Sequence, residues 1–111
     1  MVRPQPLVVT FEDQEWDLSC VRDFARVLEA TCQSPDVIVD MSIVTFIDCA
    51  CLGRLLAMRS ERAANGFPPA NLVIASIHVR RLFTVLKFDT IWPIFDSLEA
   101  ALRESTVPAA S

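Results

Sequence analysis

The chain has 111 residues, which is the usual size of one compact domain and too short for two ordinary hydrophobic cores. Hydrophobic residues make up 52% of the sequence and charged residues 22%, so there is enough apolar material for a core and a wholly disordered chain is excluded. The net charge is −4 and no basic cluster is larger than Arg80-Arg81, which argues against a nucleic-acid-binding protein.

The sequence contains no segment that predicts export or a membrane span. No apolar run approaches the roughly 18 residues that a spanning helix needs, and residues 1–6 lack the apolar stretch of a signal peptide. We therefore expect a cytoplasmic chain without a membrane partner. Its four cysteines are expected to be reduced thiols, because disulfides are rare in that compartment: Cys20, Cys32, Cys49 and Cys51.

The first third of the chain predicts a strand followed by a helix. The β-branched apolar run at residues 7–11 predicts the strand, and the acidic residues 12–15 predict the turn that ends it. Apolar residues then recur at helical spacing over residues 20–34. Asp17 or Ser19 is suited to cap this helix, because a short polar side chain accepts hydrogen bonds from the first unpaired N–H groups.

The middle of the chain predicts a strand, a helix and a second buried strand. The continuous apolar run at residues 37–41 is typical of a central strand that is covered on both faces. A short run at residues 44–48 ends in Asp48, which we expect to cap a helix that stops at Gly66. Residues 71–75 predict the next buried strand.

The last third repeats the order of helix and strand. Ser76 is suited to cap a helix that carries its apolar residues between positions 79 and 86. Residues 91–95 predict a strand at the edge of the sheet, because Pro93 has no N–H group to donate to a neighbour. Residues 96–102 predict a short terminal helix.

Strands that alternate with helices indicate an α/β fold, because parallel strands need crossover connections. We expect a mainly parallel or mixed central sheet of about four to five strands with about four helices. Residues 1–111 form one domain in this interpretation, with a core at about residues 7–103 and a flexible tail at residues 104–111. Partner and ligand sites of such sheets lie at the carboxyl ends of the strands, where residues 48–51 are expected.

The segment Asp48-Cys49-Ala50-Cys51-Leu52, together with residues 37–48 before it, resembles the STAS-domain family, specifically the bacterial anti-sigma-factor antagonists. In those proteins a similar run precedes Asp-Ser-Ser-Gly-Leu. Residues 71–83 resemble the family's fourth strand and third helix, and residues 91–102 resemble its terminal strand and helix. Residues 15–18 are similar to its Gly-Glu-Leu-Asp segment.

The resemblance extends over about residues 8–102 and implies a STAS-like, non-enzymatic regulator without a cofactor. Such a domain binds an anti-sigma factor with a histidine-kinase-like ATPase fold and so frees a sigma factor for transcription. In the family the partner kinase phosphorylates the first Ser after the Asp, which ends the interaction. Cys49 occupies that position here, so the phospho-acceptor hydroxyl is absent. Lys87 stands where the family usually has a Gly after the third helix.

The resemblance also implies which residues bind the partner. We expect a monomer or weak homodimer that docks on the anti-sigma factor through the Asp17 turn and the loop and helix that follow Asp48, with no nucleic acid involved. The expected contact residues are Asp17, Asp48, Cys49, Ala50, Cys51, Leu52 and Arg54.

Two alternatives remain open at the same loop. Unpaired N–H groups at a helix start stabilise a thiolate, so oxidation or alkylation of Cys49 or Cys51 could switch partner binding. The fold could instead serve as a scaffold or ligand-binding STAS module. A metal site and an enzyme are weaker interpretations, because His78 adds only a third ligand to the two thiols and has no evident group to orient it as a base.

Overall fold

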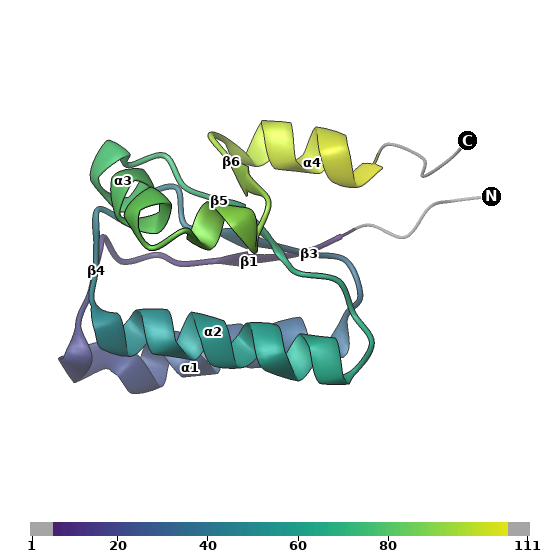
Figure 1. Ribbon diagram of the computed structural model, residues 1–111, viewed down its shortest axis with the longest axis horizontal. Helices are drawn as coiled ribbons and strands as arrows, with labels where there is room; N and C mark the ends of the chain where they lie inside the picture. The colour runs from purple at the N-terminus through teal and green to yellow at the C-terminus, as the bar shows by residue number, and fades with distance from the viewer. Residues whose placement is uncertain (1–5, 107–111) are drawn as a thin grey trace.

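A parallel four-stranded sheet forms the centre of the molecule in the computed structural model, which describes residues 6–106 (Figure 1). Its strand order is β1 (Leu7–Thr10), β3 (Val37–Asp40), β5 (Asn71–Val73) and β6 (Ile94–Phe95). All three strand pairs are parallel. The predicted α/β fold with a parallel sheet is therefore confirmed, and β3 has the central position that its apolar run indicated.

Helices cover both faces of this sheet. α1 (Val21–Glu29) and α2 (Cys49–Ala64) lie side by side on one face, and α4 (Leu98–Thr106) lies on the other (Figure 1). α3 (Ile77–Val85) adds its buried side chains to the core on the α1/α2 side. The buried strand β3 serves both cores, because successive side chains of a strand point to opposite faces.

A second, two-stranded sheet was not predicted. β2 (Glu15–Trp16) pairs in parallel with β4 (Phe46–Ile47), so Glu15 belongs to a strand and not to the acidic turn expected at residues 12–15. Trp16 anchors this small sheet in the core, where its ring contacts Phe11 at a centroid distance of 5.0 Å. The pairing holds the starts of the two following helical segments next to each other.

The helix starts agree with the predicted caps, whereas two strands end earlier in the sequence than predicted. The Ser76 side chain accepts a hydrogen bond from the N–H of Val79, as expected for the cap of α3. The predicted helix over residues 20–34 is composite, with α1 between the 3₁₀ turns η1 (Leu18–Cys20) and η2 (Ala30–Gln33). The strands expected at residues 7–11 and 71–75 end one and two residues earlier, respectively.

The C-terminal segment differs from its prediction at both ends. Residues 88–90 form a 3₁₀ turn (Phe88–Thr90), and only the last two residues of the expected 91–95 strand pair with β5, at the sheet edge. α4 continues to Thr106, so Glu104 belongs to a helix and not to the expected tail. Residues 107–111 of that tail lie outside the described residues.

Lys87 occupies a backbone conformation that favours glycine. Its φ is 62° and its ψ is 25°, and it follows Leu86, the C-cap residue of α3. The left-handed region costs a residue with a Cβ atom about 1–2 kcal/mol, which glycine avoids. The glycine that the resemblance implies at this position would avoid this cost, and the turn forms here with a lysine.

A buried arginine joins the C-terminal half of α2 to two loops. The Arg62 side chain is fully buried and uses all of its N–H donors on backbone carbonyls. Nη1 donates to Ser34 O at 2.6 Å and also to Thr31 O, and Nη2 donates to Pro35 O at 2.9 Å. Nε and Nη2 both donate to Pro68 O, at 3.1 and 2.9 Å. One side chain thus fixes the segments that enter β3 and β5.

Replacing Arg62 should be strongly destabilising. We expect Arg62→Met to lower the free energy of unfolding by roughly 3–5 kcal/mol, because it leaves several buried carbonyls without a donor. Arg103→Met is the matched control on the exposed surface of α4, where a change within about 0.5 kcal/mol is expected. Urea unfolding measures both, and equal effects of the two substitutions would contradict this role of Arg62.

Candidate functional site

Two capped helix starts lie next to each other at the carboxyl ends of β2 and β4. The N–H of Asp48 donates to Trp16 O at 3.0 Å, which ties the start of α2 to the residue before Asp17. The Asp48 carboxylate accepts hydrogen bonds from the N–H groups of Ala50 and Cys51, at 3.0 and 3.2 Å. This is the N-cap that the sequence predicted.

Asp17 caps the short η1 turn in the same way. Its Oδ1 accepts hydrogen bonds from the Ser19 N–H at 2.9 Å and from the Ser19 hydroxyl at 2.5 Å. These bonds lower the pKa of Asp17, so the carboxylate is charged at neutral pH. Of the two cap candidates, Asp17 is therefore the cap and Ser19 is its donor.

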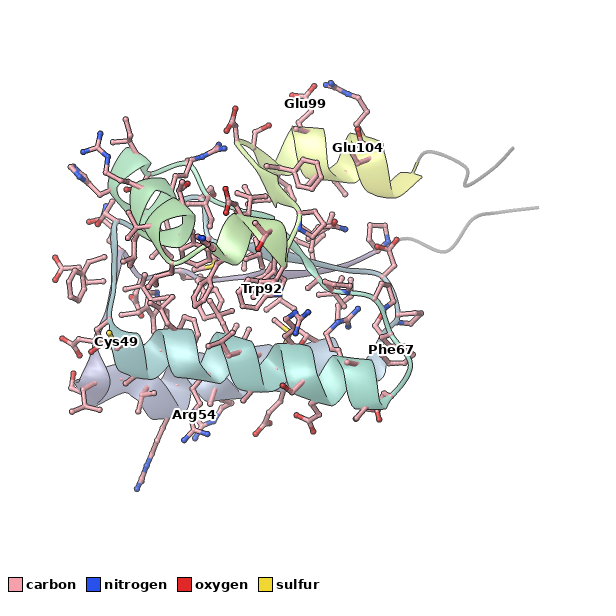
Figure 2. All side chains as sticks on the ribbon, in the orientation of Figure 1. Cys49, Arg54, Phe67, Trp92, Glu99 and Glu104 are labelled. Carbon is pink, nitrogen blue, oxygen red and sulfur yellow. The ribbon has the colours of Figure 1, made fainter. Side chains whose placement is uncertain are left out.

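The residues predicted to contact a partner differ in their exposure. The Cys49 side chain is exposed in the first turn of α2, at one end of the helix (Figure 2), and Ala50 is half-buried. Cys51 is 0% exposed and Leu52 is 4% exposed. Both side chains pack in the core, so in this structure they lie beneath the loop and not on its surface. Arg54 is exposed one turn further along the helix.

Cys51 is a buried thiol. Its Sγ donates to Asp17 O at 3.7 Å. Burial raises the pKa of Cys51 to about 12, and the charge of Asp48 adds to this effect. A thiol that keeps its proton is a poor nucleophile, so the environment of Cys51 disfavours the direct oxidation or alkylation that the sequence left open for it. Of the two predicted redox residues, only Cys49 is open to solvent.

Exposed apolar side chains adjoin the two caps. Leu18 is 69% exposed in η1 and Phe46 is 49% exposed in β4. We call the surface formed by Asp17, Leu18, Phe46, Asp48 and Cys49 the helix-start surface. The sequence did not single out Leu18 and Phe46. Exposed apolar side chains next to polar ones are common at protein interfaces, which makes this surface suited to bind another protein.

His78 lies at the rim of this surface. It lines a hollow of about 130 Å³ between α3 and β4, together with Phe46 and Leu82.

Within residues 6–106, no group of three or more His, Cys, Asp or Glu side chains has a geometry that could hold a metal ion. Over the same range, the structure contains no helix that is both long and apolar enough to span a membrane.

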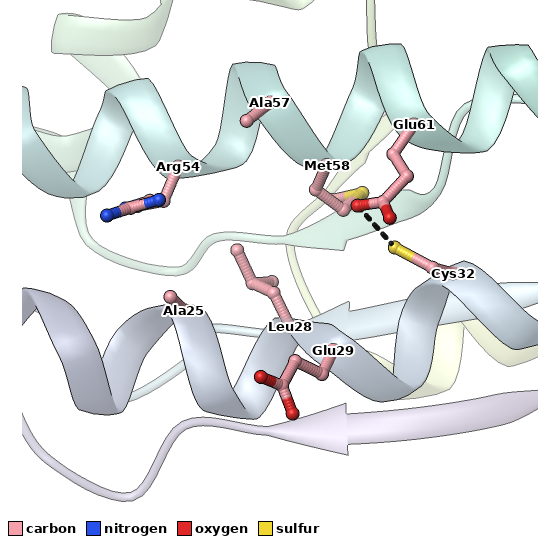
Figure 3. Close-up of a pocket in the computed structure, with 8 residues that line it drawn as sticks. All are labelled: Ala25, Leu28, Glu29, Cys32, Arg54, Ala57, Met58 and Glu61. Carbon is pink, nitrogen blue, oxygen red and sulfur yellow. Dashed lines mark hydrogen bonds between the residues drawn. The ribbon is translucent and has the colours of Figure 1, made fainter.

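A second hollow, of about 210 Å³, lies between α1 and α2 (Figure 3). Leu28 and Met58 contribute apolar surface to it, and Arg54 lines it from the α2 side. The Cys32 thiol also lines it and donates to Glu61 Oε2 at 3.3 Å, and burial together with this bond raises the pKa of Cys32. Arg54 therefore faces the groove between the helices, beside the helix-start surface.

Comparison with known proteins relates this architecture to one family. The STAS domain family matches residues 4–101. The structure of an anti-sigma-factor antagonist (STAS) domain protein from Planctomyces limnophilus has a TM-score of 0.77 and 19% identity, with 92% of this chain and 91% of that chain covered. An anti-sigma factor antagonist from Mycobacterium paratuberculosis has a TM-score of 0.76 and 21% identity, with 88% and 83% covered. The anti-sigma factor antagonist SpoIIAA in its unphosphorylated form has a TM-score of 0.70 and 21% identity, with 98% and 96% covered. No curated protein sequence matches the chain.

The different environments of Cys49 and Cys51 can be measured by alkylation. With iodoacetamide at pH 8, we expect Cys49 to react in the folded chain and Cys51 to be protected. A pKa of about 12 leaves Cys51 a thiolate fraction roughly a thousandfold below that of an ordinary thiol, and burial blocks the reagent. Peptide mass spectrometry measures both rates, and the chain unfolded in urea is the control. Equal rates in the folded chain would contradict this assignment.

Proposed function

Because the chain belongs to the STAS domain family, we propose that it is a non-enzymatic regulator that acts in the cytoplasm. In this proposal it binds an anti-sigma factor with a histidine-kinase-like ATPase fold and so frees a sigma factor for transcription. Support comes from the three solved structures described above, whose names identify them as anti-sigma factor antagonists.

One observation carries the proposal: Cys49 is exposed on a capped helix start. The sequence resemblance implies that this is the position at which the antagonists have their phospho-acceptor Ser. Asp48 fixes the backbone of this turn through two hydrogen bonds. The neighbouring Asp17 and Phe46 extend the surface with a charge and an apolar side chain. Contact with the partner is assigned to Asp17, Asp48, Cys49, Ala50 and Arg54, whereas Cys51 and Leu52 support the loop from beneath.

The charge of the helix-start surface indicates the chemistry of the partner. Glu12, Asp13 and Glu15 are exposed in the segment that leads to Asp17, and Asp48 adds a further carboxylate. A basic surface on the anti-sigma factor would complement these charges, with apolar residues opposite Leu18 and Phe46. Complementary charges accelerate association and weaken with added salt.

The missing hydroxyl at position 49 removes the usual switch. A phosphate there would add roughly −1.5 to −2 charges beside two carboxylates, which explains how phosphorylation ends binding in the family. Cys49 has no hydroxyl to accept a phosphate. The proposed regulator therefore binds its partner without being released by phosphorylation at this position.

Affinity capture tests the proposed partner. The wild-type chain, kept reduced in a lysate of its source, should recover a protein with a histidine-kinase-like ATPase fold, identified by mass spectrometry. Asp17→Asn and Asp48→Asn should each lower recovery about tenfold, and high salt should lower it for the wild type. Glu104→Gln removes a charge from α4, away from Cys49 (Figure 2), and should leave recovery unchanged.

Two results would overturn this assignment. One is the absence of any such ATPase from the reduced wild-type sample. The other is an equal loss of recovery with Glu104→Gln, which would show that general charge and not the helix-start surface determines binding.

Phosphate transfer tests the missing switch. With the recovered partner and labelled ATP, the wild type should take up no phosphate, and Cys49→Ser should become labelled because it restores a hydroxyl in the same exposed turn. Ala50→Ser is the matched control, since it adds a hydroxyl one residue away, at a half-buried position. Labelling of the wild type at any residue would refute this part of the proposal.

A further inference from the structure

Two thiols from different helical segments meet at one backbone carbonyl beneath the helix-start surface. Cys20 Sγ lies 3.4 Å from Asp17 O, and Cys51 Sγ lies 3.7 Å from the same oxygen. The two sulfur atoms are therefore no farther apart than the sum of these distances. Cys20 is the last residue of η1 and Cys51 lies in the first turn of α2, so a bond between them would join the two helix starts.

The geometry points to a disulfide site at Cys20 and Cys51, which forms when the chain meets a low-molecular-weight disulfide such as glutathione disulfide. All four cysteines of the described structure are free thiols, so the structure represents the reduced state. A disulfide bond of about 2 Å requires the two sulfur atoms to approach by side-chain rotation or a small shift of the η1 turn.

Two other cysteine pairs, Cys20–Cys32 and Cys49–Cys51, are poorly placed. Cys32 is bonded to Glu61, and it follows Cys20 by twelve residues along one helical segment, a separation of about 18 Å in an ideal helix. Cys49 and Cys51 are two residues apart in a helix, where side chains do not face each other. Their environments agree with this, because Cys49 is exposed and Cys51 is buried.

Exposure sets the order of the two chemical steps. Cys20 is partly exposed, whereas Cys51 is sealed in the core, so the reagent reaches Cys20 first. The Cys20 thiolate attacks one sulfur of the reagent, the reagent's S–S bond breaks, and one small thiolate leaves. The Cys20 proton goes to water.

The second step needs no access from solvent. Cys51 is protonated, so it gives its proton to the departing sulfur as its own sulfur attacks the neighbouring Cys20 sulfur. The mixed disulfide breaks, and the second small molecule leaves as a thiol. The two cysteines together lose two electrons and two protons, and one reagent disulfide is reduced to two thiols.

Formation of this bond would change the Asp17 turn. The Cys20 sulfur accepts a hydrogen bond from the Asp17 N–H at 3.2 Å, and its thiol also lies 3.7 Å from Asp17 Oδ1. A disulfide sulfur has no hydrogen to donate, so Asp17 Oδ1 loses the thiol as a donor while its turn is tied to α2. Rearrangement of Asp17 would alter partner binding, a consequence that rests on the proposed function.

The test uses the full chain with Cys32→Ala and Cys49→Ala, which retains Cys20 and Cys51. After incubation with oxidised glutathione, we expect both thiols to be lost and the chain mass to fall by two hydrogen atoms, without a bound glutathione. The matched chain with Cys32→Ala and Cys51→Ala retains Cys20 and Cys49, and it should accumulate glutathione adducts instead. Circular dichroism verifies that both variants are folded.

Wild-type chain provides a measurement that does not depend on the variants. Non-reducing peptide mapping after oxidation should give a peptide pair linked through Cys20 and Cys51. Glutathione adducts at Cys20 without this linked pair would overturn the assignment, and so would equal internal oxidation of the two double variants.

Failure of the disulfide and failure of the proposed partner are distinguishable. Disulfide formation is measured on the purified chain alone, whereas partner recovery is measured on the reduced chain. Where both succeed, we expect oxidation to change partner recovery. Recovery by the oxidised Cys20–Cys51 chain should differ at least tenfold, in either direction, from recovery by the same chain after reduction. Unchanged recovery would refute the regulatory role.

Discussion

The position of α2 is the constraint on which the helix-start surface depends. At the N-terminal end, the β2–β4 pairing and the hydrogen bond from Asp48 N–H to Trp16 O fix the first turn. At the C-terminal end, Arg62 binds the loops that lead into β3 and β5. A rigid helix held at both ends presents its first turn in a defined place, which a recognition surface requires.

Holding the C-terminal end of α2 in this way requires the burial of a charged side chain, Arg62, which costs free energy. Burial lowers the pKa of Arg62, because the charged form loses its hydration. Five hydrogen bonds to carbonyls compensate for that loss, and the Phe67 ring lies 5.5 Å from the guanidinium carbon as a further favourable contact. A buried cation without such partners would not be tolerated, so the loops around Arg62 and the helix that carries it are mutually dependent.

Local signals account for the parts of the fold that the sequence predicted. The apolar run of β3, the caps at Asp48 and Ser76, and the stop at Gly66 with its φ of 80° all arise from properties of a few neighbouring residues. The β2–β4 sheet has only two residues in each strand, which is too short for a periodic pattern. This sheet forms by pairing residues that are about thirty positions apart in the sequence. The exposure of Phe46 depends on the same pairing.

For the candidate site, the sequence predicted which residues lie at a helix start better than it predicted which of their side chains are buried. It placed Asp48 and Cys49 at a helix start, but it treated Cys51 as equivalent to Cys49. A signal was present, because Cys51, Leu55, Met58 and Arg62 follow one another at helical spacing and all four are buried. No local sequence pattern predicts that Cys20 and Cys51 lie close together. Their proximity arises only when η1 packs against α2 around Asp17 O.

In the proposed function, Cys49 stands where the resembling antagonists have their phospho-acceptor Ser, and this would change which kind of switch the surface can support. A phosphate acts through charge, and its effect is strong on a surface that already bears Asp17 and Asp48. A disulfide between Cys20 and Cys51 adds no charge and acts through geometry, by exchanging the hydrogen bonds of one turn for a covalent link to α2. The buried position of Cys51 suits that role, because the thiol responds only to a sulfur delivered by Cys20 and is protected from other reagents. The thiol at position 49 and the proximity of two further thiols beneath it are independent features. If both proposals hold, regulation at this surface passes from the partner's kinase activity to the redox state of the surroundings.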